Sequence, residues 1–150
     1  MPIKKYTHPD KLEKYSFWWS EARLVIAAIA LFIGGTPPVL ALNPISALYG
    51  FVGSLLTLSW FISGIAAGYL LYRWHENKRK LFGKEDTKDT VAFFVMVVSG
   101  LNLGIAGLFG TNIGMAISQS QFIFVVVGLL YLVSAGYLLM RFNASGKKMF

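Results

Sequence analysis

Charged residues divide the chain into two long apolar stretches, Leu24–Tyr72 and Thr90–Met140, which contain no Lys, Arg, Asp or Glu. A transmembrane helix needs about 20 mostly apolar residues, so each stretch has room for two helices and a short turn. The pattern therefore predicts an all-α integral membrane protein with four transmembrane helices, arranged as two tandem helical hairpins. The expected helices are Glu21–Leu42, Ile45 or Ala47 to Trp74, Thr90–Gly110 and Gln121–Phe142.

The same pattern divides the chain into five segments. Composition supports it, because 14% of the residues are charged, whereas soluble domains carry about 25%. The polar leader is long and no small-residue cleavage site follows the first apolar stretch, so that stretch does not have the form of a signal peptide. The expected segments are a cytoplasmic or interfacial leader (1–22), a first hairpin (23–74), a basic linker (75–89), a second hairpin (90–142) and a tail (143–150).

The basic residues predict the orientation of the helices. All 14 Lys and Arg lie before the first apolar stretch, between the two stretches or after the second. Short basic loops stay in the cytoplasm, so both termini and the linker are expected on the cytoplasmic side of the inner membrane. The cluster Lys78, Arg79 and Lys80 is expected to contact anionic lipid headgroups. This juxtamembrane placement also argues against nucleic acid as a partner, despite the net charge of +7.

Two aromatic residues, Trp18 and Trp19, precede the first apolar stretch. Tryptophan is enriched where helices meet the membrane surface, so both are expected to contact lipid headgroups. An aromatic ligand cage is the alternative interpretation.

Small residues recur where close helix contacts are expected. Gly-x-x-x-Gly spacing exposes backbone on one helix face, so that another helix can approach, from the same chain, a second copy or another membrane protein. The expected packing residues are Gly64, Gly68, Gly100, Asn102, Gly104, Gly107 and Gly136. The adjacent prolines Pro37 and Pro38 remove backbone donors, so the first helix is expected to kink or to end there.

A short sequence at the end of the first hairpin recurs at the end of the second. Ala67–Trp74 and Ala135–Phe142 differ at only two positions. Because each hairpin crosses twice, the two copies would enter from the same side, as parallel repeats. The alternative is that Tyr, Arg and Trp recur at any cytoplasmic helix end.

The run Ser99–Gly110 resembles a small two-helix bacterial membrane domain of unknown function, whose first helix carries a Gly-x-Leu-Asn-Trp-Gly-Leu-Val-Gly-like motif. Leu103 stands where that family has its characteristic Trp. The resemblance covers about 91–140 and implies a membrane-embedded hairpin. It implies no activity.

Reactive groups are sparse in the apolar stretches. Cys is absent, and His8 and His75 lie outside the expected helices. No Asp or Glu is expected to be buried, so neither an enzyme site, a cofactor site nor a proton relay is predicted. The acidic residues Glu85, Asp86 and Asp89 match no standard metal-ligand spacing and are expected to cap the start of a helix.

Two functions fit this pattern. The first is a non-enzymatic structural or accessory subunit of a larger membrane assembly. The alternative is an oligomeric channel or carrier for a small uncharged or weakly charged solute. Asn102 could be a packing contact or a pore-lining group. The second hypothesis requires a continuous polar cavity lined by Thr57, Ser59, Ser63, Ser99 and Asn102.

Overall fold

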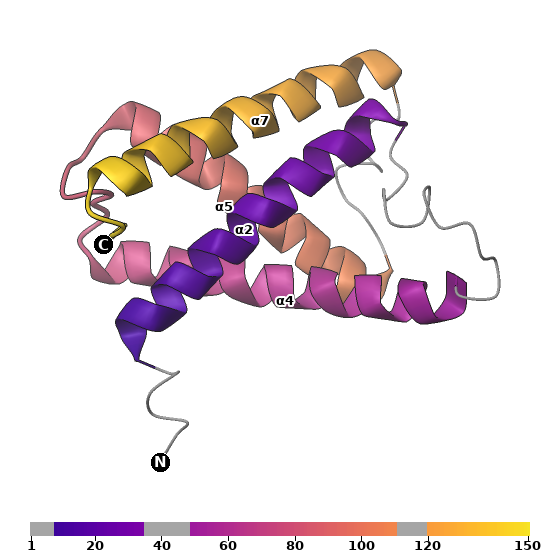
Figure 1. Ribbon diagram of the computed structural model, residues 1–150, viewed down its shortest axis with the longest axis horizontal. Coiled ribbons are helices and arrows are strands. Elements are labelled where there is room, and N and C mark those ends of the chain that lie inside the picture. The colour runs from indigo at the N-terminus through magenta and orange to yellow at the C-terminus, as the bar shows by residue number, and fades with distance from the viewer. Residues whose placement is uncertain (1–7, 35–48, 111–119) are drawn as a thin grey trace.

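The fold is a bundle of long helices. The computed structural model describes residues 8–34, 49–110 and 120–150, in which no strand occurs (Figure 1). The prediction of an all-helical chain is therefore confirmed over the described residues. The helices are α2 (Pro9–Phe32), α4 (Tyr49–Glu76), α5 (Thr87–Phe109) and α7 (Gln121–Ala144).

Three of these helices are long and apolar enough to cross a membrane. They are α4 from Gly50 to Glu76, the whole of α5 and the whole of α7. Helix α2 does not meet this criterion, because its first two turns are polar and Glu21 and Arg23 follow. The chain thus has the composition and helix lengths of a small membrane protein.

The first helix begins earlier in the sequence than expected. The predicted start near Glu21 is wrong, because α2 begins at Pro9 with His8 as its N-cap. Proline suits this first position, where its missing N–H costs no helical hydrogen bond. The helix ends at Phe32, and Gly34 follows with φ of 86°. The predicted kink at Pro37 and Pro38 lies outside the described residues.

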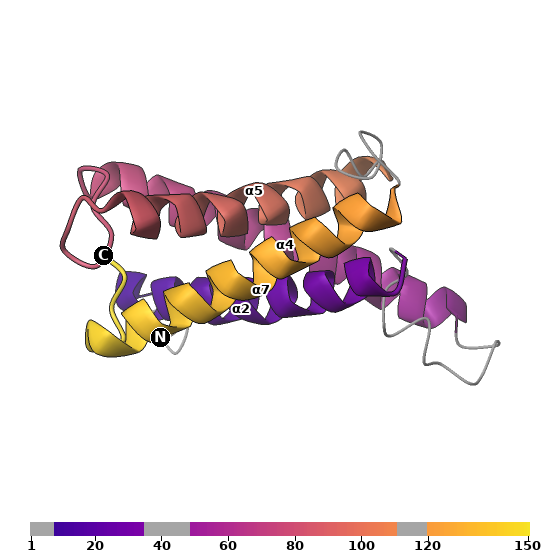
Figure 2. The ribbon, with the colours of Figure 1, turned by 90° about the horizontal axis from the view of Figure 1, so that it is seen from above.

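Helix α2 runs along the bundle from one end to the other. Near its start, Glu13 lies beside Arg73 at the end of α4. The Trp19 indole donates a hydrogen bond to Ser63, near the middle of α4. Near its end, the Phe32 ring lies against Gly128, close to the start of α7. The two ribbon views show α2 and α7 side by side and antiparallel (Figures 1 and 2).

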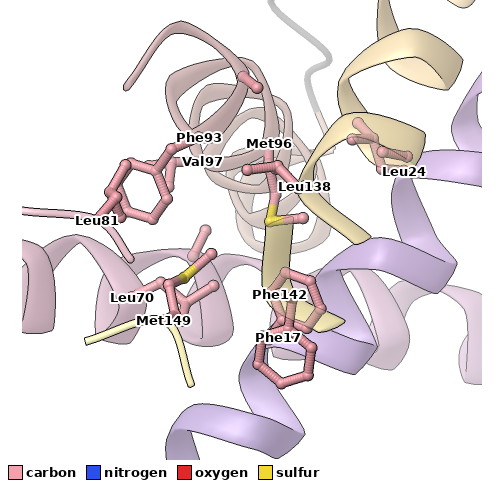
Figure 3. Close-up of a cluster of buried hydrophobic side chains, with 13 residues drawn as sticks. Phe17, Leu24, Leu70, Leu81, Phe93, Met96, Val97, Leu138, Phe142 and Met149 are labelled. Atoms are coloured by element: carbon pink, nitrogen blue, oxygen red, sulfur yellow. The ribbon is translucent and has the colours of Figure 1, made fainter. Parts of the chain in front are cut away.

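The hydrophobic core is concentrated towards the end of the bundle at which α2 and α5 begin. Phe17 and Phe142 stack there, with ring centroids 4.1 Å apart (Figure 3). Leu81 from the linker and Met149 from the tail are also buried in this core. The linker and the tail therefore close this end of the bundle, which we call the linker end.

Glycine allows α4 and α5 to touch along their backbones. A Cβ atom at Gly104 would lie 2.7 Å from the Cα atom of Gly64. A Cβ at Gly100 would meet the Ala67 Cβ at 2.7 Å, and one at Gly107 would meet the Phe61 backbone N at 2.9 Å. These contacts agree with the expected packing role of four of the glycines.

The other two glycines expected to pack helices lie in open space. A Cβ at Gly68 or at Gly136 would meet no atom within 4 Å. Neither residue therefore packs a helix within the described part of the chain. A contact of either glycine with a second chain stays a prediction.

Buried positions recur between the two halves of the chain over more residues than the short sequence match covers. Every buried residue of α2 has a buried counterpart in α5, 76 positions later. Helices α4 and α7 show a similar correspondence at the separation of 68 positions seen in the sequence. The buried residues Ala66, Ala67 and Leu70 of α4 correspond to the buried Ser134, Ala135 and Leu138 of α7. The α2–α5 pairs are Glu13–Asp89, Phe17–Phe93, Ser20–Met96, Glu21–Val97, Arg23–Ser99, Leu24–Gly100 and Ala28–Gly104.

The turns after the second helix of each hairpin repeat as well. Lys78 and Arg79 have φ of 57° and 61°, and their counterparts Gly146 and Lys147 have φ of 73° and 61°. Equivalent backbone hydrogen bonds close both turns, Arg79 N to Trp74 O and Lys147 N to Phe142 O, each 2.9 Å long. The repeat therefore includes the linker and the tail.

The contact between α4 and α5 predicts opposite outcomes for two glycine substitutions. Gly104→Leu should lower the free energy of unfolding by about 2–3 kcal/mol, because the new side chain would separate two touching backbones. Gly68→Leu, the control, should change it by less than about 0.5 kcal/mol in the monomer. Thermal melts in detergent would compare the variants. A Gly104→Leu variant as stable as the wild type would contradict the contact.

Candidate functional site

Glu13 on α2 is held in a buried polar site at the linker end. Its side chain is 1% exposed, and one carboxylate oxygen accepts hydrogen bonds from the backbone N–H groups of Met149 at 2.8 Å and Phe150 at 3.2 Å. The other oxygen lies 3.6 Å from an Arg73 guanidinium nitrogen. A single carboxylate thus joins α2, α4 and the tail.

Asp89 on α5 occupies the corresponding site of the second hairpin. Its side chain is fully buried, and Tyr137 donates to it from α7 at 2.7 Å. Arg141 completes a bidentate pair through Nε at 3.0 Å and Nη2 at 3.1 Å. Asp86 caps α5, accepting from the Lys88 and Asp89 backbone N–H groups, as the acidic cluster predicted.

The two carboxylates and their arginines form a related pair of sites. Glu13 and Asp89 are 76 positions apart, as are the other equivalent residues of α2 and α5. Arg73 and Arg141 are 68 positions apart, as are those of α4 and α7. Each arginine also lies over an aromatic ring: Arg73 is 5.9 Å from the centroid of Phe150 in the tail, and Arg141 is 5.3 Å from that of Phe82 in the linker. The linker end is therefore interlocked across the repeats.

These sites correct the prediction that no Asp or Glu is buried. The useful signal in the sequence was the repeated Tyr-Leu-Leu-x-Arg motif, which places Tyr and Arg four residues apart on one helix face. In α7 both side chains of the motif bind Asp89. In α4 the Tyr69 hydroxyl reaches the Pro9 carbonyl at 3.4 Å, while Arg73 faces Glu13.

A second polar site lies in the middle of the bundle around Arg23. The side chain is 7% exposed and donates hydrogen bonds to the Ser99 hydroxyl and the Met96 carbonyl, both at 2.8 Å. Because Arg23 and Ser99 are equivalent positions of the two repeats, their contact lies where the hairpins meet. A Cβ at Gly100 would lie 3.1 Å from the guanidinium, so the absent side chain leaves space for it.

Several polar atoms of this central site have no hydrogen-bond partner among the described residues. They are buried, and they belong to about one turn of α2. A buried charge without full pairing is costly, so the site has unused capacity for a water molecule or another polar group. The atoms are Ser20 Oγ, Glu21 Oε1 and Arg23 Nε.

The polar residues expected to line a pathway are bonded within the bundle instead. The Thr57 and Ser59 hydroxyls donate to carbonyls of their own helix, at 3.0 Å and 2.7 Å. The Ser63 hydroxyl donates to the Ser59 carbonyl and accepts from Trp19, and Ser99 accepts from Arg23. Asn102 is half-buried and also has an interaction partner. In the part of the chain that the structure describes, these side chains therefore have partners within the protein.

The residues expected at lipid headgroups are divided between two environments. Lys78, Arg79 and Lys80 are exposed in the turn after α4. Trp18 is 46% exposed and makes edge contacts with Phe17 and Phe142. Trp19 is 38% exposed, and its indole is hydrogen-bonded to Ser63 on α4. The headgroup contacts stay a prediction, and for Trp19 the depth of Ser63 in α4 makes a surface position less favourable.

No group of three or more residues suited to binding a metal occurs in residues 8–34, 49–110 and 120–150. Comparison with protein-family models, curated proteins and solved structures finds no match. The resemblance over 91–140 to the two-helix membrane domain therefore stays a prediction.

The Asp89 site predicts unequal effects for two neighbouring carboxylates. Asp89→Ala should lower the free energy of unfolding by about 3–5 kcal/mol, because it leaves Arg141 and Tyr137 without their partner. Asp86→Ala should cost only about 1 kcal/mol, the usual value of a helix cap. Chemical denaturation in detergent would measure both. Equal losses would show that Asp89 acts only as part of the cap.

Proposed function

We propose that this chain is a non-enzymatic, multi-pass protein of the cytoplasmic membrane that serves as a structural or accessory subunit of a larger membrane assembly. The observation that carries the proposal is the hydrogen bonding of the polar side chains within the protein. The hydroxyl groups best placed to line a pathway are bonded to neighbouring helices or to their own backbone. A bundle of this kind can hold and position partners without having a reaction centre of its own.

The outer surface of the bundle supports a membrane location. Large apolar side chains are exposed along all four helices, whereas soluble monomers rarely expose contiguous apolar patches of more than a few hundred Å². The exposed residues include Ile26 and Ile29 on α2, Leu55 and Leu58 on α4, Val98 and Leu108 on α5, and Leu129 and Val133 on α7.

Helix α2 is proposed to be the fourth transmembrane helix. Its 24 residues span about 36 Å, enough for a hydrocarbon core of about 30 Å. Its polar residues Glu13, Glu21 and Arg23 are buried towards the other helices, while Val25, Ile26 and Ile29 are exposed. Ionisable residues inside membranes usually face the bundle interior in this way.

The proposed orientation places the linker end in the cytoplasm. Exposed basic residues of the turn after α4 and of the tail lie together at this end (Figure 1). They would face anionic headgroups of the inner leaflet, following the positive-inside rule. The open faces at Gly68 and Gly136 would then be available to a second copy or to another membrane protein.

A carrier is the second candidate, and the central site favours it. Arg23 and Glu21 are ionisable, buried and incompletely hydrogen-bonded. Ionisable residues at membrane depth often mark the path of an ion or a proton. The two candidates differ in whether this site ever opens to solvent.

Transport measurements separate the two candidates. Purified protein in liposomes should show no flux above empty liposomes for protons, small anions or small neutral solutes, because the hydroxyl groups that could line a pathway are hydrogen-bonded within the protein. Arg23→Met and Asn102→Leu would be measured in parallel. Flux by the wild type that either substitution abolishes would contradict the accessory role and establish the carrier.

A further inference from the structure

An apolar groove of about 450 Å³ runs between α5 and α7 on the outside of the bundle. One wall is the face of α5 from Thr90 to Ser99, and the other includes Leu130 and Tyr131 of α7. The lining residues Val91 and Val98 are 55% and 60% exposed, so the groove opens outward. In a membrane this opening faces lipid.

The dimensions of the groove limit its occupant. The nine-residue rise from Thr90 to Ser99 is about 13.5 Å, close to half of a hydrocarbon core of about 30 Å. The lining is mostly apolar, and the groove is open to the outside of the bundle along its length. An extended hydrocarbon chain lying along α5 fits this length and this lining.

The first hairpin shows what fills the equivalent place there. Trp19 corresponds to Val95, and Ser63 corresponds to Tyr131, at the repeat separations given above. The Trp19 indole occupies this position and is fixed by its hydrogen bond to Ser63 at 2.9 Å. In the second hairpin the smaller Val95 leaves the space as part of the groove. The first hairpin thus has Trp19 and Ser63 at this place, and the second has Val95 and Tyr131, which both line the groove.

We propose that the α5–α7 groove binds one acyl chain of a phospholipid from the cytoplasmic leaflet. The chain would lie along α5 with its terminal methyl group towards Ser99, and the headgroup would lie beyond Thr90. Lys88 is exposed one turn before Val91 on the same helix face, and Asp86 is exposed nearby, so both charge signs occur at this end. Binding therefore depends on the acyl chain. This assignment rests on the proposed membrane location and orientation.

Val95→Trp tests the assignment, because it places in the second hairpin the tryptophan that the first hairpin has at the equivalent position, Trp19. Detergent-purified protein would be titrated with phosphatidylglycerol and with phosphatidylcholine, and native mass spectrometry would measure the first lipid bound. Val95→Trp should weaken binding of both lipids at least tenfold, because the indole fills the groove. Leu129→Trp, an exposed position of α7 outside the groove, should stay within twofold of the wild type.

A second variant keeps the test valid if Val95→Trp does not fold. Val95→Trp combined with Tyr131→Ser reproduces the Trp–Ser pair of the first hairpin and should show the same loss of lipid. Wild-type affinity in the folded variants would overturn the proposal, as would a wild-type dimer that Val95→Trp dissociates. A chain that does not fractionate with membranes would instead refute the proposed function itself.

Discussion

Buried charge is the constraint on which this structure depends. In an apolar bundle an ionised group must be paired or hydrogen-bonded, because removing it from water without a partner is costly. Glu13 and Asp89 meet this requirement by binding groups from other segments: Glu13 binds the tail and faces Arg73, and Asp89 binds Tyr137 and Arg141. These contacts determine which helix ends meet, and they bring the linker and the tail onto the core.

The repeat explains why the interior has this organisation. Two hairpins with the same pattern of buried positions come together so that Arg23 meets its counterpart Ser99. Arg73 reaches the Phe150 ring in the tail, and Arg141 reaches the Phe82 ring in the linker. The two hairpins differ where equivalent positions carry side chains of different size. Trp19 and Ser63 in the first hairpin correspond to Val95 and Tyr131, which line the groove in the second. Leu24 corresponds to Gly100, whose missing side chain accommodates the Arg23 guanidinium.

Much of the fold could be predicted from the absence of charge in two long stretches. The positions of α4, α5 and α7 follow from it to within a few residues, and Gly64 and Gly104 pack as their spacing suggested. The extent of α2 could not be predicted in this way. A hydropathy average counts Glu13, Glu21 and Arg23 as polar whether their side chains face other helices or water. Their burial depends on partners far away in the chain. The open positions of Gly68 and Gly136 show a similar limit, since spacing identifies a bare helix face but not the surface that it meets.

The central claim is that α2 crosses the bilayer beside the other three helices, with its charged side chains facing inward. A nitroxide at Ile26, which is exposed on α2 one turn beyond Arg23, tests this directly in liposomes. Labels at Leu101 on α5 and at Glu85 in the linker provide the membrane and water references, and collision rates with oxygen and with a water-soluble nickel chelate report depth. The account predicts that the Ile26 label behaves as the Leu101 label does, with high oxygen and low nickel collision rates. A label at Ile26 that is as accessible to nickel as the one at Glu85 would contradict it.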